Sequence, residues 1–372
     1  MEKRDALRYR IAPLEMTPSE FRKVGRQLVE RIADFLCTLP DRPVVPNESP
    51  QVIREALGTS SLPEEGAESK DLLEEAANLL FEHSTFNGHP RFWGMITSPA
   101  APIGALGDLL AASVNPNLGG WLLAPVATEI EAQTIRWIAE LVGYPTDCGG
   151  LLVSGGNMAN FVGFLAARKA KATWDVRAAG LLGQGARRLR VYTSSETHTW
   201  IHNAADMFGL GIEAIRWIPV DEQLRMDTTA LKNQIQEDIE AGDLPYLVVS
   251  TAGTVSTGAV DPLPEIAAIC REYDLWFHVD GAYGGFAAAL INDGKETVPR
   301  DLKGISEADS VAVDPTSGSM RRWRLGVPWY AILKRCVRRS AIILPITTSL
   351  TRPNQPSITM NTGRRTRGAS VP

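Results

Sequence analysis

Polar residues follow several strand-like runs in this chain, and their types suit the binding of a planar, anionic ligand. The run LWFHVD (275–280) ends in Asp280, and Ala282 follows two residues later. A carboxylate at the exit of a buried strand is costly unless a cation or a hydrogen-bond donor meets it. Asp280 is therefore a candidate partner for a protonated ring nitrogen, or else a helix N-cap or a structural acceptor.

A glycine pair offers a second candidate binding element. The segment LLVSGGNMANFVGFLAARKA places Gly155, Gly156 and Asn157 immediately before a predicted helix. Free N–H groups and the dipole at a helix N-terminus suit a phosphate, and glycine lets the phosphate approach closely. A bare Gly-Gly does not define a ligand by itself, and neither GxxxxGK[ST] nor GxGxxG fits here.

Two further residues could contact a flat ligand. His198, in SSETHTW, follows the strand-like run 189–194; its imidazole could lie over a planar cofactor or move protons, or be an ordinary surface or core histidine. Thr251 is the last polar residue of the run YLVVSTA (246–252), which small residues follow, a composition that an ordinary loop shares. Together the phosphate loop, histidine, hydroxyl loop and strand-end aspartate form the set that a pyridoxal phosphate (PLP) enzyme needs, in which an Asp keeps the pyridine nitrogen protonated.

The elements that would position these residues alternate along the chain. Apolar strand-like runs at 189–194, 246–252, 275–280 and 310–314 are separated by amphipathic helices, among them 158–170 and 262–274. This order predicts an α/β fold with a mostly parallel sheet covered on both faces, with ligands beyond the carboxyl ends of the strands. Upstream we expect helices over about 16–40, opened by a Thr-x-x-Glu capping box, 70–83 and 124–142, with a connector over 41–70.

Composition narrows the class of protein. Apolar residues make up 44% of the 372 residues and charged residues 22%, which is typical of a globular chain. No apolar run reaches the roughly 18 residues of a membrane span, and the first residues lack the apolar core of a signal peptide, so we expect a cytoplasmic protein without membrane contacts. The four cysteines lack ligand spacing, so neither disulfides nor a metal site is indicated.

Charge is distributed unevenly. Residues 315–372 hold 11 of the 38 basic residues and none of the 43 acidic ones, so the net charge of −5 combines a portion at −16 with a tail at +11. A basic tail that binds nucleic acid is one explanation.

Five segments in the correct order resemble the PLP-dependent group II decarboxylases, the family of aromatic-L-amino-acid decarboxylase: SGGNMANFVGFLAAR, SSETHTW, TAGTVSTGAVDPL, HVDGAYGG and ADSVAVDP. The similarity covers roughly residues 16–315. The resemblance implies that Gly155, Gly156 and Asn157 hold the phosphate of pyridoxal 5'-phosphate, His198 stacks on the ring, Thr251 lies beside it, Asp280 pairs with the ring nitrogen and Ala282 lines the other face.

The chain departs from the family after ADSVAVDP. The family has His-Lys-Trp there, whose lysine forms the Schiff base, whereas this chain reads TSGSMRRWRLG and has no lysine between Lys303 and Lys334. The loss of one base near the codon of Pro315 explains both the missing lysine and the missing acids. With one C restored, TSGSMRRWR can be read as HKWLYAPLE, and the single codons of Met320 and Trp323 force their parts of that reading. We therefore expect an out-of-frame tail that packs poorly.

The resemblance implies a PLP-dependent transferase-like (fold type I) large domain, with a C-terminal small domain missing. We expect a helical arm and connector over 1–85, an incomplete large domain over 86–315 and the out-of-frame tail over 316–372. The implied activity is decarboxylation of an amino acid, an aromatic one in the first instance, by a homodimer, with negligible turnover because the Schiff-base lysine is absent. The alternatives are a pseudoenzyme that keeps PLP, or a polyanion binder whose basic tail recognises no specific nucleic acid.

Overall fold

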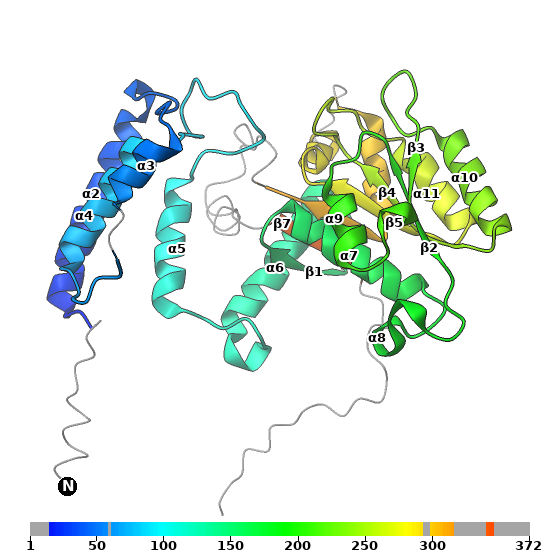
Figure 1. The fold of residues 1–372 in the computed structure, drawn as a ribbon, viewed down its shortest axis with the longest axis horizontal. Helices are drawn as coiled ribbons and strands as arrows, with labels where there is room; N and C mark the ends of the chain where they lie inside the picture. Colours follow the sequence, from blue (N-terminus) through cyan, green and yellow to red (C-terminus); the bar gives the residue numbers. More distant parts are fainter. Residues whose placement is uncertain (1–14, 59–60, 293–297, 316–339, 346–372) are drawn as a thin grey trace, which may run out of the picture. The chain divides into compact units, whose positions relative to one another are not determined.

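The structure is a computed structural model that describes residues 15–58, 61–292, 298–315 and 340–345. The chain divides into two compact units, of which the first ends at Asn115 and the second contains Pro116–Pro315 and the strand 340–345 (Figure 1). No helix within these ranges is long and apolar enough to cross a membrane. The expected boundary between residues 85 and 86 stays a prediction.

The first unit is helical, as expected of the arm. α2 begins at the predicted capping box, in which the Thr17 Oγ1 accepts from the Glu20 N–H and the Glu20 carboxylate accepts from the Thr17 N–H. α2 packs on α4 through the stacked rings of Phe35 and Phe81, whose centroids are 4.3 Å apart. The helices of this unit are α2 (Pro18–Thr38), α3 (Pro50–Leu57), α4 (Ser69–His83) and α5 (Pro102–Val114).

Two of these helices were not expected. α3 lies inside the predicted connector 41–70, because Ser49 caps it and Pro50 occupies its first turn, where a proline removes no helical hydrogen bond. α5 lies in a segment whose glycines and prolines obscured the helical spacing of its leucines.

The second unit is built on one seven-stranded sheet, with the order β1-β7-β6-β5-β4-β2-β3. Every strand except β7 runs in the same direction, which confirms the mostly parallel α/β fold. The strands are β1 (Cys148–Val153), β2 (Leu189–Ser194), β3 (Ile215–Ile218), β4 (Leu244–Thr251), β5 (Trp276–Gly281), β6 (Ser310–Val313) and β7 (Ser340–Pro345).

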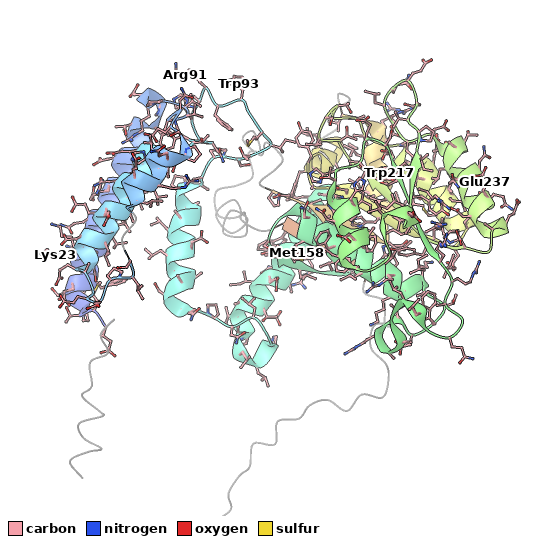
Figure 2. All side chains as sticks on the ribbon, in the orientation of Figure 1. Lys23, Arg91, Trp93, Met158, Trp217 and Glu237 are labelled. Carbon is pink, nitrogen blue, oxygen red and sulfur yellow. The ribbon has the colours of Figure 1, made fainter. Side chains whose placement is uncertain are left out.

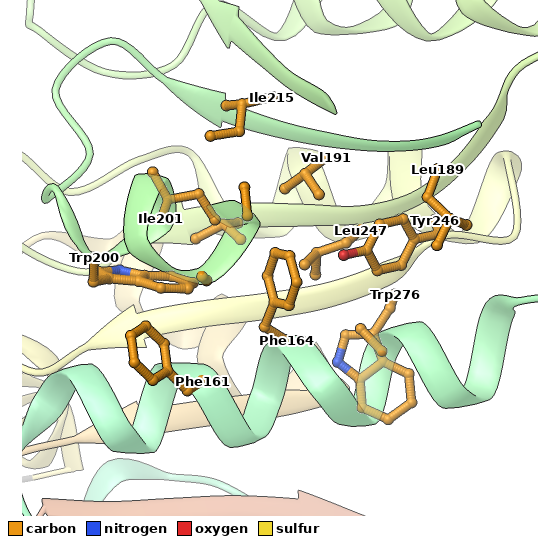
Figure 3. Close-up of a cluster of buried hydrophobic side chains, with 14 residues drawn as sticks. Phe161, Phe164, Leu189, Val191, Trp200, Ile201, Ile215, Tyr246, Leu247 and Trp276 are labelled. Carbon is orange, nitrogen blue, oxygen red and sulfur yellow. The ribbon is translucent and has the colours of Figure 1, made fainter. Parts of the chain in front are cut away.

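Helices cover both faces of this sheet. Val191 and Val249 join the aromatic rings of α7 and α9 in one apolar cluster (Figure 3), whereas the neighbouring Tyr192 donates to Asp238 of α10 on the opposite face. The helices are α6 (Pro125–Val142), α7 (Gly156–Lys171), α8 (Val176–Ala179), α9 (Trp200–Met207), α10 (Thr228–Glu240), α11 (Leu263–Glu272) and α12 (Ala289–Asn292).

Most predicted strands lie within two residues of their expected bounds. β4 begins earlier than expected, at Leu244, although Pro245 cannot donate to a sheet ladder. The register with β2 shifts between Arg190 and Val191, opposite Pro245, and this irregularity accommodates the proline. β3 was missed because it is short and carries the exposed Trp217.

β7 lies in the predicted out-of-frame tail. Ser340–Pro345 pairs antiparallel with β1 and with β6, and Ile343 is fully buried. These six residues therefore form a paired strand, and the expectation of poor packing is wrong for Ile343; SAIILP is an apolar, partly β-branched run that suits a sheet. The rest of 316–372, including the segment TSGSMRRWRLG, lies outside the described residues.

Candidate functional site

The predicted site residues of the second unit come together at the carboxyl ends of the parallel strands. Gly155 and Gly156 connect β1 to α7, and Gly155 has a φ of +98°, a conformation that L side chains rarely adopt. A Cβ placed on Gly156 would lie 3.2 Å from the Cβ of Ala282, so the start of α7 abuts the segment that follows β5. Asn157 is exposed in the first turn of α7, beside Met158, which Figure 2 labels.

Asp280 is a buried charged group at this edge. It is 5% exposed on β5, and its Oδ1 accepts from the Ala282 N–H at 3.2 Å. Burial raises the pKa of Asp280, while hydrogen bonds from Ala282, Asn160 and Trp200 oppose the rise. No ion pair to Asp280 exists within the described ranges, so its charge is met by neutral donors.

Thr251 lies beside Asp280, because the two residues are partners in the β4–β5 register. The Thr251 side chain is buried, and its Oγ1 has no hydrogen-bond partner among the described residues. Its backbone N–H donates to Asp261 Oδ2 at 2.7 Å, and Asp261 Oδ1 accepts from the Met226 N–H at 2.8 Å. The buried Asp261 thus fixes the strand end and leaves the Thr251 hydroxyl for another partner.

His198 is exposed just before α9, and it acts electrostatically on Asp280. Its Nδ1 accepts from the Trp200 N–H at 3.3 Å, which orients the ring against the start of the helix. The other histidine of this segment, His202, lies away from Asp280 and packs on Trp217, with ring centroids 4.8 Å apart.

Sequence reasoning missed three residues next to Asp280. The indole Nε1–H of Trp200 donates to Asp280 Oδ2 at 2.7 Å. Asn160 donates to the same carboxylate, and its Oδ1 lies 2.8 Å from His278 Nε2. The available signal was spacing: His278 precedes Asp280 by two positions on one face of β5, and Asn160 follows Gly156 by one turn of α7.

Lysines of this unit lie elsewhere. Lys171 pairs with Asp274 at 2.6 Å, just before β5, and Lys232 pairs with Glu272 at 2.9 Å, at the end of α11. Both are therefore at the opposite edge of the sheet from Asp280. Lys169 lies in the last turn of α7, and Lys303 is exposed ahead of β6. Within the described part of this unit, no lysine lies at the carboxyl ends of the strands.

The arrangement suits a flat, cationic heterocycle that carries an anionic group. Among the described residues, the buried carboxylate of Asp280 has no cation beside it and the buried hydroxyl of Thr251 has no hydrogen-bond partner, and the glycine pair opens the N-terminus of α7. An N–H⁺ of a ring, a polar substituent and a phosphate would meet these three groups.

Comparisons with known proteins agree with this chemistry. Residues 50–370 match the family described as the pyridoxal-dependent decarboxylase conserved domain. Over 302 residues the chain is 35% identical to the aromatic-L-amino-acid decarboxylase of Bacillus atrophaeus, which covers 81% of this chain and 60% of that protein. It is 34% identical over 248 residues to the cysteine sulfinic acid decarboxylase of Mus musculus, covering 67% of this chain and 48% of that protein.

Solved structures show the same fold. The crystal structure of mouse CSAD aligns with a TM-score of 0.77 and 28% identity, over 90% of this chain and 66% of that one. The crystal structure of Oryza sativa TDC with PLP aligns with a TM-score of 0.76 and 25% identity, over 92% and 69%. The chain spans about 60% or less of the length of the curated relatives it matches first.

Proposed function

Because this chain belongs to the pyridoxal-dependent decarboxylase family, we propose that it carries a PLP site at the carboxyl ends of β1, β4 and β5. The observation that carries the proposal is the buried Asp280, whose charge has no described counter-cation. A pyridinium N–H⁺ would supply that cation.

Different residues of the site would bind different parts of PLP. The backbone N–H groups of Gly156 and Asn157 would bind the phosphate at the start of α7, where the helix dipole favours an anion. The Gly155 N–H donates to the Val153 carbonyl at 3.0 Å, so Gly155 would contribute the shape of the loop that admits the phosphate. The imidazole of His198 covers one face of the ring, and Ala282 lines the other. The Asp280 carboxylate would accept a hydrogen bond from the protonated ring nitrogen.

We propose an amino acid as the substrate and an aromatic L-amino acid as the first choice. The bound cofactor supplies an electron-poor ring that stabilises negative charge on the substrate carbon from which CO₂ leaves. Asp280 contributes by keeping the ring nitrogen protonated, and Thr251 by offering to a ring substituent its hydroxyl, for which the described ranges hold no partner. The preference for an aromatic substrate rests on the 35% identity with the Bacillus atrophaeus protein.

We propose that the chain as written has negligible turnover, because the position of the family's lysine holds no lysine. The one-base loss near codon 315 is the proposed cause. Sequencing of independent DNA reads across this codon tests the cause directly. An unbroken frame that encodes TSGSMRRWRLG in every read would contradict it.

The activity is tested with two versions of the gene, as written and with one base restored ahead of codon 316. Release of CO₂ is measured with an aromatic L-amino acid and with cysteine sulfinate. We expect release only from the restored version, and faster with the aromatic substrate. Substantial release by the written chain would refute its inactivity, and faster release from cysteine sulfinate would refute the substrate.

A PLP-binding pseudoenzyme is the second candidate, and the missing lysine is the observation that favours it. This candidate predicts that PLP binds to the written chain without a covalent link at the site. Borohydride reduction followed by peptide mapping tests this, since only a Schiff base becomes a stable label. A stoichiometric label on a single lysine would contradict a pseudoenzyme without a covalent anchor.

We also propose that the chain pairs with a second copy. α5 buries only Gly104 and exposes an apolar stripe at helical spacing, formed by Ile103, Leu106 and Leu110. A homodimer would cover such a stripe. Sedimentation measurements of the full chain and of Leu106→Glu test this; a monomeric wild-type chain would refute it.

A further inference from the structure

The Asp280 carboxylate is held by a tryptophan that cannot easily turn away. Trp200 is fully buried, and its Nε1–H donates to Asp280 Oδ2 at 2.7 Å. Its ring meets His278 edge-on, with 6.0 Å between centroids. The ring of Phe161 lies 6.4 Å away on another side, as Figure 3 shows. The packing of the indole therefore fixes the direction from which Asp280 receives this hydrogen bond.

A second donor to Asp280 is oriented by a buried chain of hydrogen bonds. Trp276 Nε1–H donates to Ser310 Oγ at 2.8 Å, and Ser310 Oγ lies 2.7 Å from His278 Nδ1. Asn160 Oδ1 lies 2.8 Å from His278 Nε2 and can only accept, so Nε2 carries the ring proton; in the neutral ring Nδ1 is then an acceptor and receives the Ser310 hydroxyl proton.

The direction of these hydrogen bonds determines which end of the Asn160 amide faces Asp280. Since the Asn160 oxygen accepts from His278, its NH₂ group is the part available to Asp280, to which Asn160 donates. Burial lowers the pKa of His278 to about 3, so its imidazole stays neutral near pH 7. The direction of the hydrogen bonds from Trp276 to Asn160 therefore does not change near that pH.

We propose that Trp200 and Asn160 are positioning residues, whose N–H groups keep the Asp280 carboxylate ionised and oriented toward a ring nitrogen. This inference rests on the proposed PLP site. Burial favours the protonated carboxyl group, which is a poor partner for a ring N–H⁺, and two fixed donors oppose that effect. His198 is the described titratable group that acts on the same charge.

Two ligands distinguish a positioning role of Trp200 and Asn160 from a purely structural role in packing. 4′-Deoxypyridoxine 5′-phosphate keeps the ring nitrogen but has no aldehyde, so its binding needs no lysine. Its 1-deaza counterpart carries C–H in place of the nitrogen. Affinities of the full-length chain and its variants for both ligands are measured by calorimetry at one pH.

We expect Trp200→Phe to weaken binding of the nitrogen ligand by about tenfold, the value of one hydrogen bond to a charged group. Binding of the deaza ligand should change less than about twofold, since it does not engage the charge of Asp280. Phe161→Leu, which shrinks the same cluster without touching Asp280, is the matched control and should affect both ligands alike. If Trp200→Phe does not fold, Asn160→Ser provides the same comparison with a smaller change in volume.

A ligand-free measurement complements these affinities. The pKa of Asp280, followed through its carboxyl infrared band and identified by difference from Asp280→Asn, should be higher in Trp200→Phe than in the wild-type chain. Equal weakening for the two ligands, or an unchanged pKa of Asp280, overturns the positioning role. A wild-type chain that binds the nitrogen ligand no better than inorganic phosphate overturns the PLP site itself, and with it this inference.

Discussion

Gly163 of α7 lies directly against the imidazole of His278 on β5. A Cβ at position 163 would lie 2.6 Å from Cε1 and 2.7 Å from Nδ1 of that ring. The ring cannot retreat, because Asn160 and Ser310 hold both of its nitrogens. The absence of a side chain at 163 is therefore what lets α7 approach the sheet at the histidine.

Gly163→Ala should destabilise the second unit by about 1–3 kcal/mol, because the methyl group overfills a packed contact. Chemical denaturation followed by circular dichroism measures the loss. Gly25→Ala is the control: Gly25 lies within α2 with nothing within 4 Å of its Cβ position, so alanine there should be neutral or stabilise the helix. A Gly163→Ala variant as stable as the wild-type chain would show that α7 shifts freely.

Gly155→Ala should cost about 1–3 kcal/mol through backbone strain alone, because the φ of +98° is unfavourable for alanine and no atom lies within 4 Å of the added carbon. Affinity for 4′-deoxypyridoxine 5′-phosphate should fall with it, since the same backbone presents the N–H groups to the phosphate. Ser154→Ala, one residue earlier, should leave both quantities nearly unchanged. An unaffected affinity in Gly155→Ala would place the phosphate elsewhere.

The stability of the second unit should carry a pH dependence from Asp261. Burial raises the pKa of Asp261 to about 6, above the ordinary 3.8, against the two backbone hydrogen bonds that lower it. The folded chain therefore holds this proton more tightly than the unfolded chain, and the stabilisation is full below pH 3.8 and lost as the pH rises through 6.

Comparison of the wild-type chain with Asp261→Asn isolates this contribution. The unfolding free energy of the wild-type chain minus that of Asp261→Asn should fall by about 2 kcal/mol from roughly pH 4 to pH 7.5. Other titrating groups are common to both chains, so their contributions cancel in this difference. Urea denaturation at a series of pH values gives the difference. A constant difference would mean that Asp261 is ionised throughout the range.

The buried ion pair of Asp238 should be among the largest single contributions to the sheet's stability. Asp238 is 2% exposed and receives Arg216 Nη2 at 2.6 Å and the Tyr192 hydroxyl at 2.8 Å. Burial alone would raise the pKa of Asp238, but these donors hold it below its ordinary value. Asp238→Ala leaves the partly buried Arg216 with only Asp243, at 3.8 Å, and should cost about 3 kcal/mol, near the lower end for a broken buried pair.

Two variants with smaller expected effects provide a scale for the stability lost in Asp238→Ala. Tyr192→Phe removes one hydrogen bond and should cost about 1 kcal/mol. Lys232→Ala removes the exposed pair with Glu272 and should cost less than about 1 kcal/mol. Thermal or urea denaturation ranks the three, and a cost for Asp238→Ala no larger than that for Lys232→Ala would refute the network's importance.

The sequence predicted the parallel sheet because its inner strands are continuous apolar runs. β2 has the predicted bounds, and the capping box of α2 has the predicted pairs. β7 could not be predicted, because an apolar hexapeptide carries no information about which strands it will join. The motif residues around Asp280 were identifiable, since each follows a strand or opens a helix.

The supports of that site were not identifiable from the sequence. Asn160 and Trp200 belong to different helices, and each reads as an ordinary member of an amphipathic pattern. Their role depends on hydrogen bonds across long sequence separations, such as the contact of His278 with Asn160. The local sequence specifies the elements, whereas the partner of a buried polar group depends on how those elements pack.

The place of β7 in the sheet has a consequence for synthesis on the ribosome. β1 carries the glycine pair into α7, yet its strand partner is β7, and Cys148 pairs with Pro345, about 200 residues later. While the chain emerges, β1 and β6 each present an open edge toward a strand that does not yet exist. These edges are the places where a chaperone, or a neighbouring nascent chain, can pair before residues 340–345 arrive.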